Sequence, residues 1–281
     1  MDRRTVLKGI FVSSAVAGTP SVALSAPQLF PSPKKSGQAE VKDYLTKIKN
    51  YNTHFADDVV LVGKELQLLK SVVARLKRVR GVVGHGNFAL LDFDSALLYA
   101  RRYSRAGKFP KEEIDFLEAV FYRNAKDYGF LGEKVMPELT SSIKRRETYK
   151  VPYTGNYLFK GDSLTLYSKI QKDIGHNITL TSGVRGVVKQ MYLFLNKAIR
   201  SDGNLSMASR SLAPPGHSFH GNGDFDVGKV GYGHRNFTED FAKTKEFKRL
   251  EELGYIRIRY HEENPFGVRF EPWHIKVSSS T

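Results

Sequence analysis

Two histidines and two carboxylates in the last third of the chain have the types and spacing of a catalytic metal site. His220 lies in a glycine-rich stretch, Asp226 follows six residues later, and His274 comes three residues after Glu271. A catalytic zinc ion is held by three His or carboxylate ligands and keeps one position for water, and a nearby carboxylate can take a proton from that water. These residues predict a metal site, with His220, Asp226 and His274 as candidate ligands and Glu271 as a carboxylate close to one of them.

The choice of the carboxylate ligand stays open on spacing alone. Asp224 precedes Asp226 by two residues, and in a strand their side chains share one face. His217 is a further candidate, more ordinary as a donor to a ligand or as a loop residue. The chain has no cysteine, which excludes disulfides, thiolate metal sites and cysteine nucleophiles. Any metal must therefore be held by His and carboxylate.

Short helices and strands must position these residues. The region from residue 149 onward alternates between helical and extended patterns, which predicts an α+β fold with helices on one face of a small antiparallel sheet. The predicted helices are 163–172, 187–199 and 245–253, and the predicted strands are 177–181, 224–227, 255–260 and 268–277.

The preceding region, 41–148, is predicted to be helical. Apolar residues recur at steps of three and four and mark one helix face: Val62, Leu66, Leu69, Val73 and Leu76. Further helices are expected over 89–105 and 110–129, the latter with Pro110 at its first position. The sequence leaves its role open between a docking domain, a lid over the cleft and a packing partner.

The first residues have the composition of an export signal. Arg3 and Arg4 precede an uncharged stretch, 9–26, that ends in small residues. This pattern resembles a twin-arginine signal peptide and predicts cleavage near residue 26. The Pro/Ser/Lys-rich stretch 27–40 is expected to be a linker. The mature chain is therefore expected to be exported, with no stable membrane anchor after cleavage.

The charge of the chain favours anionic surroundings. Lys and Arg number 44 against 29 Asp and Glu, a formal net charge of +15. Nucleic acid, anionic lipid and acidic cell-wall polymers would all suit such a charge. The basic run 75–80 lacks a nucleic-acid recognition motif and is more typical of a solvated helix face. We therefore expect no nucleic-acid partner.

Three segments together resemble the signature of the zinc D-alanyl-D-alanine carboxypeptidases and dipeptidases, the VanY-type metallopeptidases. They are 182–185 (SGVR), 215–227 (PGHSFHGNGDFDV) and 271–274 (EPWH), and the resemblance covers about 175–277. It implies that His220, Asp226 and His274 bind one Zn²⁺, and that Glu271 is the general base.

The same resemblance assigns two further residues. Arg185 would bind the substrate and steady the developing oxyanion, and Gln190 would support the site. The family usually has its aspartate seven positions after the first histidine, whereas Asp226 is six positions after His220. An apolar residue follows the family's aspartate, as Val227 follows Asp226, which favours Asp226 over Asp224.

The implied fold is a helical N-terminal region followed by a small antiparallel-sheet zinc peptidase domain over 149–281. The implied activity is hydrolysis of peptidoglycan stem peptides in the periplasm or cell wall, most simply as a D-alanyl-D-alanine carboxypeptidase. Anionic cell-wall polymers are possible partners. The alternatives are a peptidoglycan endopeptidase, an L,D-carboxypeptidase, or a non-catalytic cell-wall binding protein, against which Glu271 argues.

A carboxypeptidase must also hold a terminal carboxylate with a cation or donor beyond Arg185. The sequence offers four candidates without choosing among them: Arg210, His217, Lys229 and Arg235.

Overall fold

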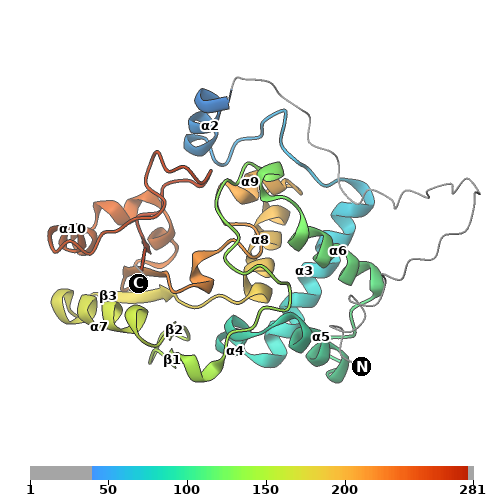
Figure 1. Cartoon of the computed structure of the whole chain (residues 1–281), viewed down its shortest axis with the longest axis horizontal. Helices are drawn as coiled ribbons and strands as arrows, with labels where there is room; N and C mark the ends of the chain where they lie inside the picture. The colour runs from blue at the N-terminus through green and yellow to red at the C-terminus, as the bar shows by residue number, and fades with distance from the viewer. Residues whose placement is uncertain (1–39, 278–281) are drawn as a thin grey trace, which may run out of the picture.

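The computed structural model describes residues 40–277, and their fold is α+β, as the sequence predicts. Helices come first along the chain, and short strands alternate with helices in the C-terminal half (Figure 1). The predicted signal peptide, 1–26, and all but the last residue of the predicted linker lie outside the described residues. Within the described part, no helix combines the length and the apolar character that a membrane span requires.

The N-terminal region is helical, as predicted. Its helices are α2 (Glu40–Lys49), α3 (Gly63–Val83), α4 (His85–Leu90), α5 (Phe93–Arg102) and α6 (Lys111–Tyr122). Most of the predicted apolar face of α3 is buried, including Leu69, Val73 and Leu76. Val62 instead precedes the helix as its N-cap and is exposed.

A helix lies within the predicted range 89–105, but it is shorter than predicted, because the chain breaks between α4 and α5. Leu91 and Asp92 have extended backbone angles. The Asp92 carboxylate accepts a hydrogen bond from the backbone N–H of Ser95 at 2.7 Å. This N-cap satisfies a backbone donor of the first turn of α5, so a new helix starts there.

The helix predicted over 110–129 is also shorter than expected. α6 ends at Tyr122, and a 3-10 helix, η1 (Ala125–Tyr128), follows it. Gly129 then takes φ = 80°, a left-handed conformation in which glycine avoids the steric cost of a side chain.

The helical region and the C-terminal part share one hydrophobic core, which α8 (Val187–Arg200) completes. The buried side chains of this core come from α3, α5, α6, α8 and α9 (Leu205–Ser209), among others, and include Leu69, Val72, Phe116, Leu117, Val188, Met191, Phe194 and Leu195. Figure 1 shows α8 beside α3, although the two helices are far apart in the sequence. The helical region is therefore a packing partner of the C-terminal part.

A three-stranded antiparallel sheet carries the C-terminal half. Its order is β3 (Ile178–Ser182), β4 (Phe225–Lys229) and β5 (His274–Ile275). One face packs into a second core with α7 (Asp162–Ile174) and α10 (Lys245–Glu252). That face carries Ile178, Leu180, Phe225, Val227 and Ile275. Because side chains alternate along a strand, Asp226 points to the opposite face.

An irregularity in β3 aims a polar side chain at that opposite face. Leu180 pairs with Val227, but Ser182 pairs with Asp226, so the register shifts by one residue between them. Without the shift, Ser182 would point with Leu180 toward the apolar core. Bulges of this kind commonly re-aim side chains beside functional sites.

The two strands predicted over 255–260 and 268–277 are largely wrong. The first is reduced to a single bridge between Ile258 and Ile275, and the second to the two residues of β5. The Asn264 side chain holds the intervening turn, donating to the Val268 carbonyl at 2.6 Å. Pro272 has no N–H to give to a strand partner, so the chain runs mainly as loop here.

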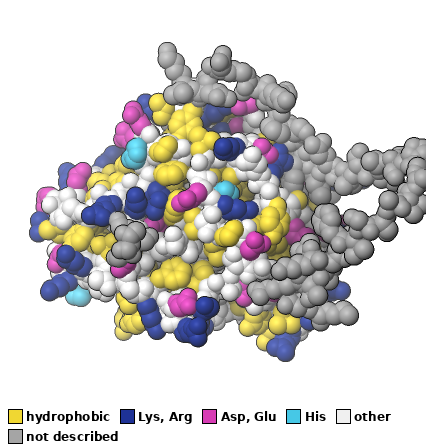
Figure 2. All heavy atoms as spheres, in the orientation of Figure 1, with side chains coloured by type: hydrophobic (Ala, Val, Ile, Leu, Met, Phe, Trp, Pro, Cys, Tyr) yellow, Lys and Arg dark blue, Asp and Glu magenta, His cyan; other side chains and the backbone are white. Residues whose placement is uncertain are grey.

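Short elements connect the larger ones. They are the hairpin strands β1 (Thr148–Lys150) and β2 (Tyr157–Phe159), and the 3-10 helices η2 (Arg145–Glu147), η3 (Phe219–Gly221), η4 (Gly233–Phe237) and η5 (Glu239–Lys243). On the face drawn in Figure 2, Lys and Arg side chains are spread among acidic and apolar ones and do not form one continuous stripe.

Candidate metal centre

The structure brings His220, Asp226 and His274 together although they come from three different elements. His220 lies in η3, Asp226 in β4 and His274 in β5, where Asp226 and His274 are register partners. One ligand atom from each residue lies within 4.8 Å of the others, and all three side chains are buried. The antiparallel pairing of β4 and β5 therefore places two of the three groups, and the η3 turn supplies the third.

His220 presents its Nε2 atom to this cluster. Its Nδ1 atom lies 2.8 Å from the Gly183 carbonyl, which can only accept, so Nδ1 carries the proton. Burial, helped by the Arg185 charge, lowers the pKa of His220 to about 4. The ring is therefore neutral at pH 7. Its unprotonated Nε2 faces Asp226 Oδ1 at 3.2 Å, so a lone pair points at a carboxylate oxygen.

His274 presents its Nδ1 atom. Its Nε2 atom lies 2.9 Å from Asp224 Oδ2, and Nδ1 lies 3.3 Å from Asp226 Oδ1. Burial would lower the pKa of His274, but hydrogen bonds to Asp224 and Asp226 raise it to about 9. Such a carboxylate partner fixes the tautomer and the ring orientation of a metal-binding histidine.

The two aspartates occupy different positions. Asp226 lies inside the cluster, and although burial would raise its pKa, the charge of Arg185 and the hydrogen bond from His274 lower it well below the ordinary value. Asp224 precedes β4 and lies on the far side of the His274 ring, where it accepts from Arg259 Nε at 2.6 Å and from the Val277 backbone N–H at 2.9 Å. The geometry therefore favours Asp226 as the ligand and gives Asp224 an orienting position.

The cluster has the donor set of a cation site. Two imidazole nitrogens and one carboxylate oxygen face one another in a buried space, and such a set suits zinc. Carboxylate negative charge and nitrogen lone pairs held this closely repel one another unless a proton or a metal ion lies between them. The residues therefore fit the metal that the sequence predicts.

Glu271 lies at the edge of the cluster in a tight turn. The backbone N–H of His274 donates to the Glu271 carbonyl at 3.1 Å, and a Glu271 carboxylate oxygen lies 3.8 Å from His274 Nδ1. Burial raises the pKa of Glu271 to about 7. Pro272 and Trp273 form the turn between them, and Trp273 packs into the core beneath the sheet.

Arg185 comes from the loop between β3 and α8. Its Nη2 donates to Asp226 Oδ2 at 2.6 Å and its Nε donates to Ser182 Oγ at 3.0 Å. A Cβ atom at Gly183 would lie 1.9 Å from the Tyr157 carbonyl oxygen, so only glycine fits this turn. The glycine of the SGVR segment thus allows β2 to approach closely, and the same residue's carbonyl holds His220.

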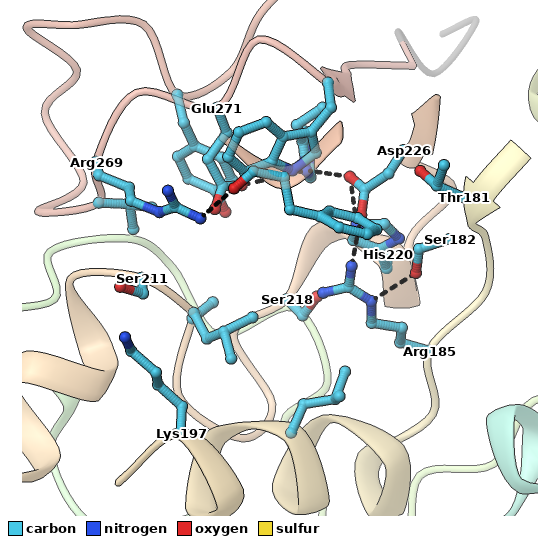
Figure 3. A pocket seen from close by; sticks show the side chains of 18 of the residues that line it. Thr181, Ser182, Arg185, Lys197, Ser211, Ser218, His220, Asp226, Arg269 and Glu271 are labelled. Carbon is cyan, nitrogen blue, oxygen red and sulfur yellow. Dashed lines mark hydrogen bonds and ion pairs between the residues drawn. The ribbon is translucent and has the colours of Figure 1, made fainter. Parts of the chain in front are cut away.

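A pocket of about 710 Å³ connects these groups. Figure 3 shows His220, Asp226 and Arg185 at one end and Lys197 and Ser211 at the other. Glu271 also lines the pocket. Gln190 does not line it and donates to the Ala213 carbonyl at 2.5 Å, a contact that supports the neighbouring loop.

The four candidates for a terminal-carboxylate group do not line this pocket. Arg210 is buried and paired with Asp58 at 2.7 Å, and His217 Nδ1 lies 2.9 Å from the Glu133 carbonyl. Lys229 pairs with Glu246 at 3.4 Å, and Arg235 stacks over Tyr232.

Sequence reasoning missed the cations that do line the pocket: Lys189, Lys197, Arg200 and Arg269. The first three lie on one face of α8 at helical spacing. That spacing was a usable signal for these three residues.

The part of the chain that contains this site matches a known protein family. Residues 162–279 match the family model described as VanY: D-alanyl-D-alanine carboxypeptidase, which confirms the predicted resemblance for this part of the chain. No curated protein matches the chain.

Two solved structures are similar at low identity. One is an LdcB LD-carboxypeptidase, with 22% identity and a TM-score of 0.38 over 46% of this chain and 63% of that chain. The other is a mutant of the vancomycin resistance D,D-pentapeptidase VanY from a VanB-type cassette in complex with Zn(II). That match has 24% identity and a TM-score of 0.38 over 47% of this chain and 78% of that chain. The chain therefore spans less than two thirds of the LdcB structure.

Proposed function

From the VanY-type region at residues 162–279, we propose that this protein is a zinc-dependent peptidase of peptidoglycan stem peptides that releases a C-terminal D-alanine. The observation that carries the proposal is the convergence of three buried ligand atoms, a buried carboxylate and an arginine on one pocket. A structural metal site needs no free carboxylate beside its ligands, so Glu271 favours a peptidase over a binding protein.

His220 Nε2, His274 Nδ1 and one oxygen of Asp226 would hold the zinc ion. When bound, the ion supplies a positive charge that polarises the peptide carbonyl and lowers the pKa of water. The protein's own part is orientation, because the Gly183 carbonyl and the Asp224 carboxylate fix both imidazole rings.

Glu271 would move the protons of the reaction. In its ionised form it accepts the proton of the attacking water, and it then gives that proton to the leaving nitrogen. Burial raises the pKa of Glu271 above the ordinary glutamate value, which favours a group that can take up a proton as well as release one.

Arg185 would stabilise the negative charge that develops on the carbonyl oxygen. Its guanidinium lines the pocket and is held by Asp226 and Ser182 before any substrate arrives. Donors fixed in advance stabilise a developing charge without the cost of reorganisation.

The site of action would be the periplasm or cell wall. The expected twin-arginine signal over 1–26 and the net charge of +15 support this proposal, because cell-wall polymers are anionic. Protease treatment of cells whose outer envelope has been opened but whose inner membrane is intact would test it: an exported protein is degraded while a cytoplasmic control survives.

The decisive test is D-alanine release from a pentapeptide stem that ends in D-Ala-D-Ala. The zinc-loaded protein is expected to release D-alanine, and Glu271→Gln is expected to lose about 10²–10⁴-fold in kcat while keeping its zinc. Glu239→Gln, an exposed glutamate in η5, is the control. Release only from a tetrapeptide would replace the D,D activity by an L,D activity, and cleavage only of cross-linked peptidoglycan would indicate an endopeptidase. Zinc binding without any cleavage would reject the peptidase.

A further inference from the structure

The pocket end away from His220 is lined by cations from two separate segments, and the charge of one of them, Arg269, also acts on Glu271. Lys197 and Arg200 come from the last turns of α8, and Arg269 comes from the loop before β5. Figure 3 shows Lys197 and Ser211 on the side away from His220. Tyr51 and Asn52, from the loop between α2 and α3, complete the wall.

Within the described residues 40–277, no salt bridge joins these cations to an acidic side chain, although the charge of Arg269 acts on Glu271. Lys197 Nζ donates to the neutral Asn52 Oδ1 at 3.1 Å. Burial lowers the pKa of Lys197, and the charges of Arg269, Arg200 and Arg210 lower it further. Of these, only Arg210 forms an ion pair, with both oxygens of Asp58 at 2.7 and 2.9 Å. An excess of positive charge therefore faces the pocket.

Arg269 is fixed in place by neutral groups. Its guanidinium lies 4.7 Å from the ring centre of Tyr51 and 4.8 Å from that of Trp273, and Nη2 donates to the Phe237 carbonyl at 3.0 Å. Its Nε atom is buried and has no hydrogen-bond partner among the described residues. The side chain is thus oriented without any carboxylate.

Like charges gathered around a partly buried pocket repel one another, and an anion removes that cost. A carboxylate is matched in shape by the planar guanidinium and in charge by the ammonium group. We propose that the Lys197–Arg200–Arg269 end of the pocket is an anion subsite that binds a carboxylate of the peptide remote from the scissile bond. This proposal rests on the proposed function, because it assigns a substrate feature to the same pocket.

The subsite includes residues from outside the family match. Tyr51 and Asn52 lie outside the family match at 162–279, yet Tyr51 stacks on Arg269 and Asn52 accepts from Lys197. The N-terminal helical region therefore helps to position the cations. It would select acidic stem peptides over their amidated counterparts.

Two synthetic pentapeptide stems provide the test. One carries free carboxylates at its second and third residues, the other carries carboxamides there, and both keep the terminal carboxylate. Their Kd values are measured by titration calorimetry on the full-length, zinc-loaded Glu271→Gln protein, which binds without turnover. The acidic peptide is expected to bind about tenfold more tightly, because hydrogen bonds to charged groups are the stronger ones.

The matched variants locate the effect. Lys197→Met combined with Arg269→Gln should reduce the ratio of the two Kd values to near one, whereas Lys248→Met, an exposed lysine of α10, should leave it unchanged. Thermal unfolding of each variant confirms that it is folded. Equal Kd values for both peptides, no binding of either, or a tenfold ratio that survives in the double variant would overturn the subsite.

Turnover by the wild-type chain separates this proposal from the proposed function. If both peptides are cleaved equally well and bind equally, the peptidase stands and the subsite fails. If the acidic peptide binds more tightly but no D-alanine is released from either, the subsite stands and the peptidase fails.

Discussion

The two ends of the pocket satisfy their polar groups in opposite ways. At the metal end, the outer nitrogen of each histidine has a protein partner, and Arg185 is paired on two sides. At the cationic end, Lys197 and Arg269 contact only neutral groups. The first end is oriented by the protein itself, whereas the cations of the second end form no salt bridge within the described residues. Under the proposed function, the contrast would separate residues that prepare the chemistry from residues that select the substrate.

Replacing one of the metal-binding residues should have the largest effect on zinc binding and activity. His220→Ala is expected to lose bound zinc and at least about a thousandfold in activity, because the ion stabilises transition-state charge by several kcal/mol. Metal analysis after dialysis and D-alanine release check it, with the exposed His176→Ala as the control. Retention of one zinc per chain by His220→Ala would remove this residue from the ligand set.

Replacing the carboxylate that holds the His274 ring should have a smaller effect on zinc binding. Asp224→Asn keeps an acceptor for His274 but removes its negative charge, so zinc affinity should fall about 10–100-fold. Competition with a chelator of known affinity measures the change, and exposed Asp57→Asn is the control. An unchanged affinity would show that the His274–Asp224 contact does not tune the metal site.

Lys189 lines the pocket near Arg185 and Asp226, and we expect its burial to lower the stability of the folded protein. Burial, with Arg185, lowers its pKa from 10.5 to about 7. Between these pH values the unfolded chain holds a proton that the folded chain releases, so stability falls as pH drops from 10.5 toward 7. Lys189→Met should therefore raise the free energy of unfolding at pH 7 by roughly 2–4 kcal/mol.

Urea unfolding at pH 7 and at pH 10 measures this effect, with exposed Lys172→Met as the control. The gain should shrink at the higher pH, where the folded and unfolded chains differ less in bound protons. A variant that is less stable than wild type at pH 7 would contradict the prediction.

The smallest expected effect is that of the Arg269 charge on the pKa of Glu271. Burial raises the pKa of Glu271 to about 7, and Arg269 acts to lower it. Because the base must be ionised, kcat/KM should fall about tenfold per pH unit on the acid side of its pKa, and bound zinc should move that limb to lower pH. Arg269→Gln should move the limb upward by roughly a few tenths of a pH unit. A downward shift in the pH profile would show that the charges of the two ends do not interact in this way.

The metal end could be predicted from the sequence because its residues lie in short segments of recognisable type. The glycine-rich turn around His220 and the EPWH turn carry their own local geometry, and the helices over 187–199 and 245–253 were placed within a residue of α8 and α10. Spacing could not choose between Asp224 and Asp226, since the choice depends on which side of the His274 ring each carboxylate reaches.

The cationic end could not be predicted because tertiary packing assembles it. Arg269 meets Tyr51 across most of the length of the chain, and no local pattern pairs them. The loop that carries Arg269 was predicted as part of a strand, but the Asn264 side chain and Pro272 override its extended, apolar pattern. Arg210, a candidate for binding the terminal carboxylate, instead forms an ion pair with Asp58 outside the pocket. Sequence spacing does not reveal this pair.

The shared core of α3 and α8 has a consequence for biosynthesis. The ribosome delivers α3, α5 and α6 first, and their apolar faces have no α8 to cover them until the chain has passed α7 and β3. The N-terminal helices therefore cannot finish folding as an early, independent unit. During translation they expose the kind of apolar surface that chaperones bind, and a nascent chain interrupted before residue 187 would carry that surface uncovered.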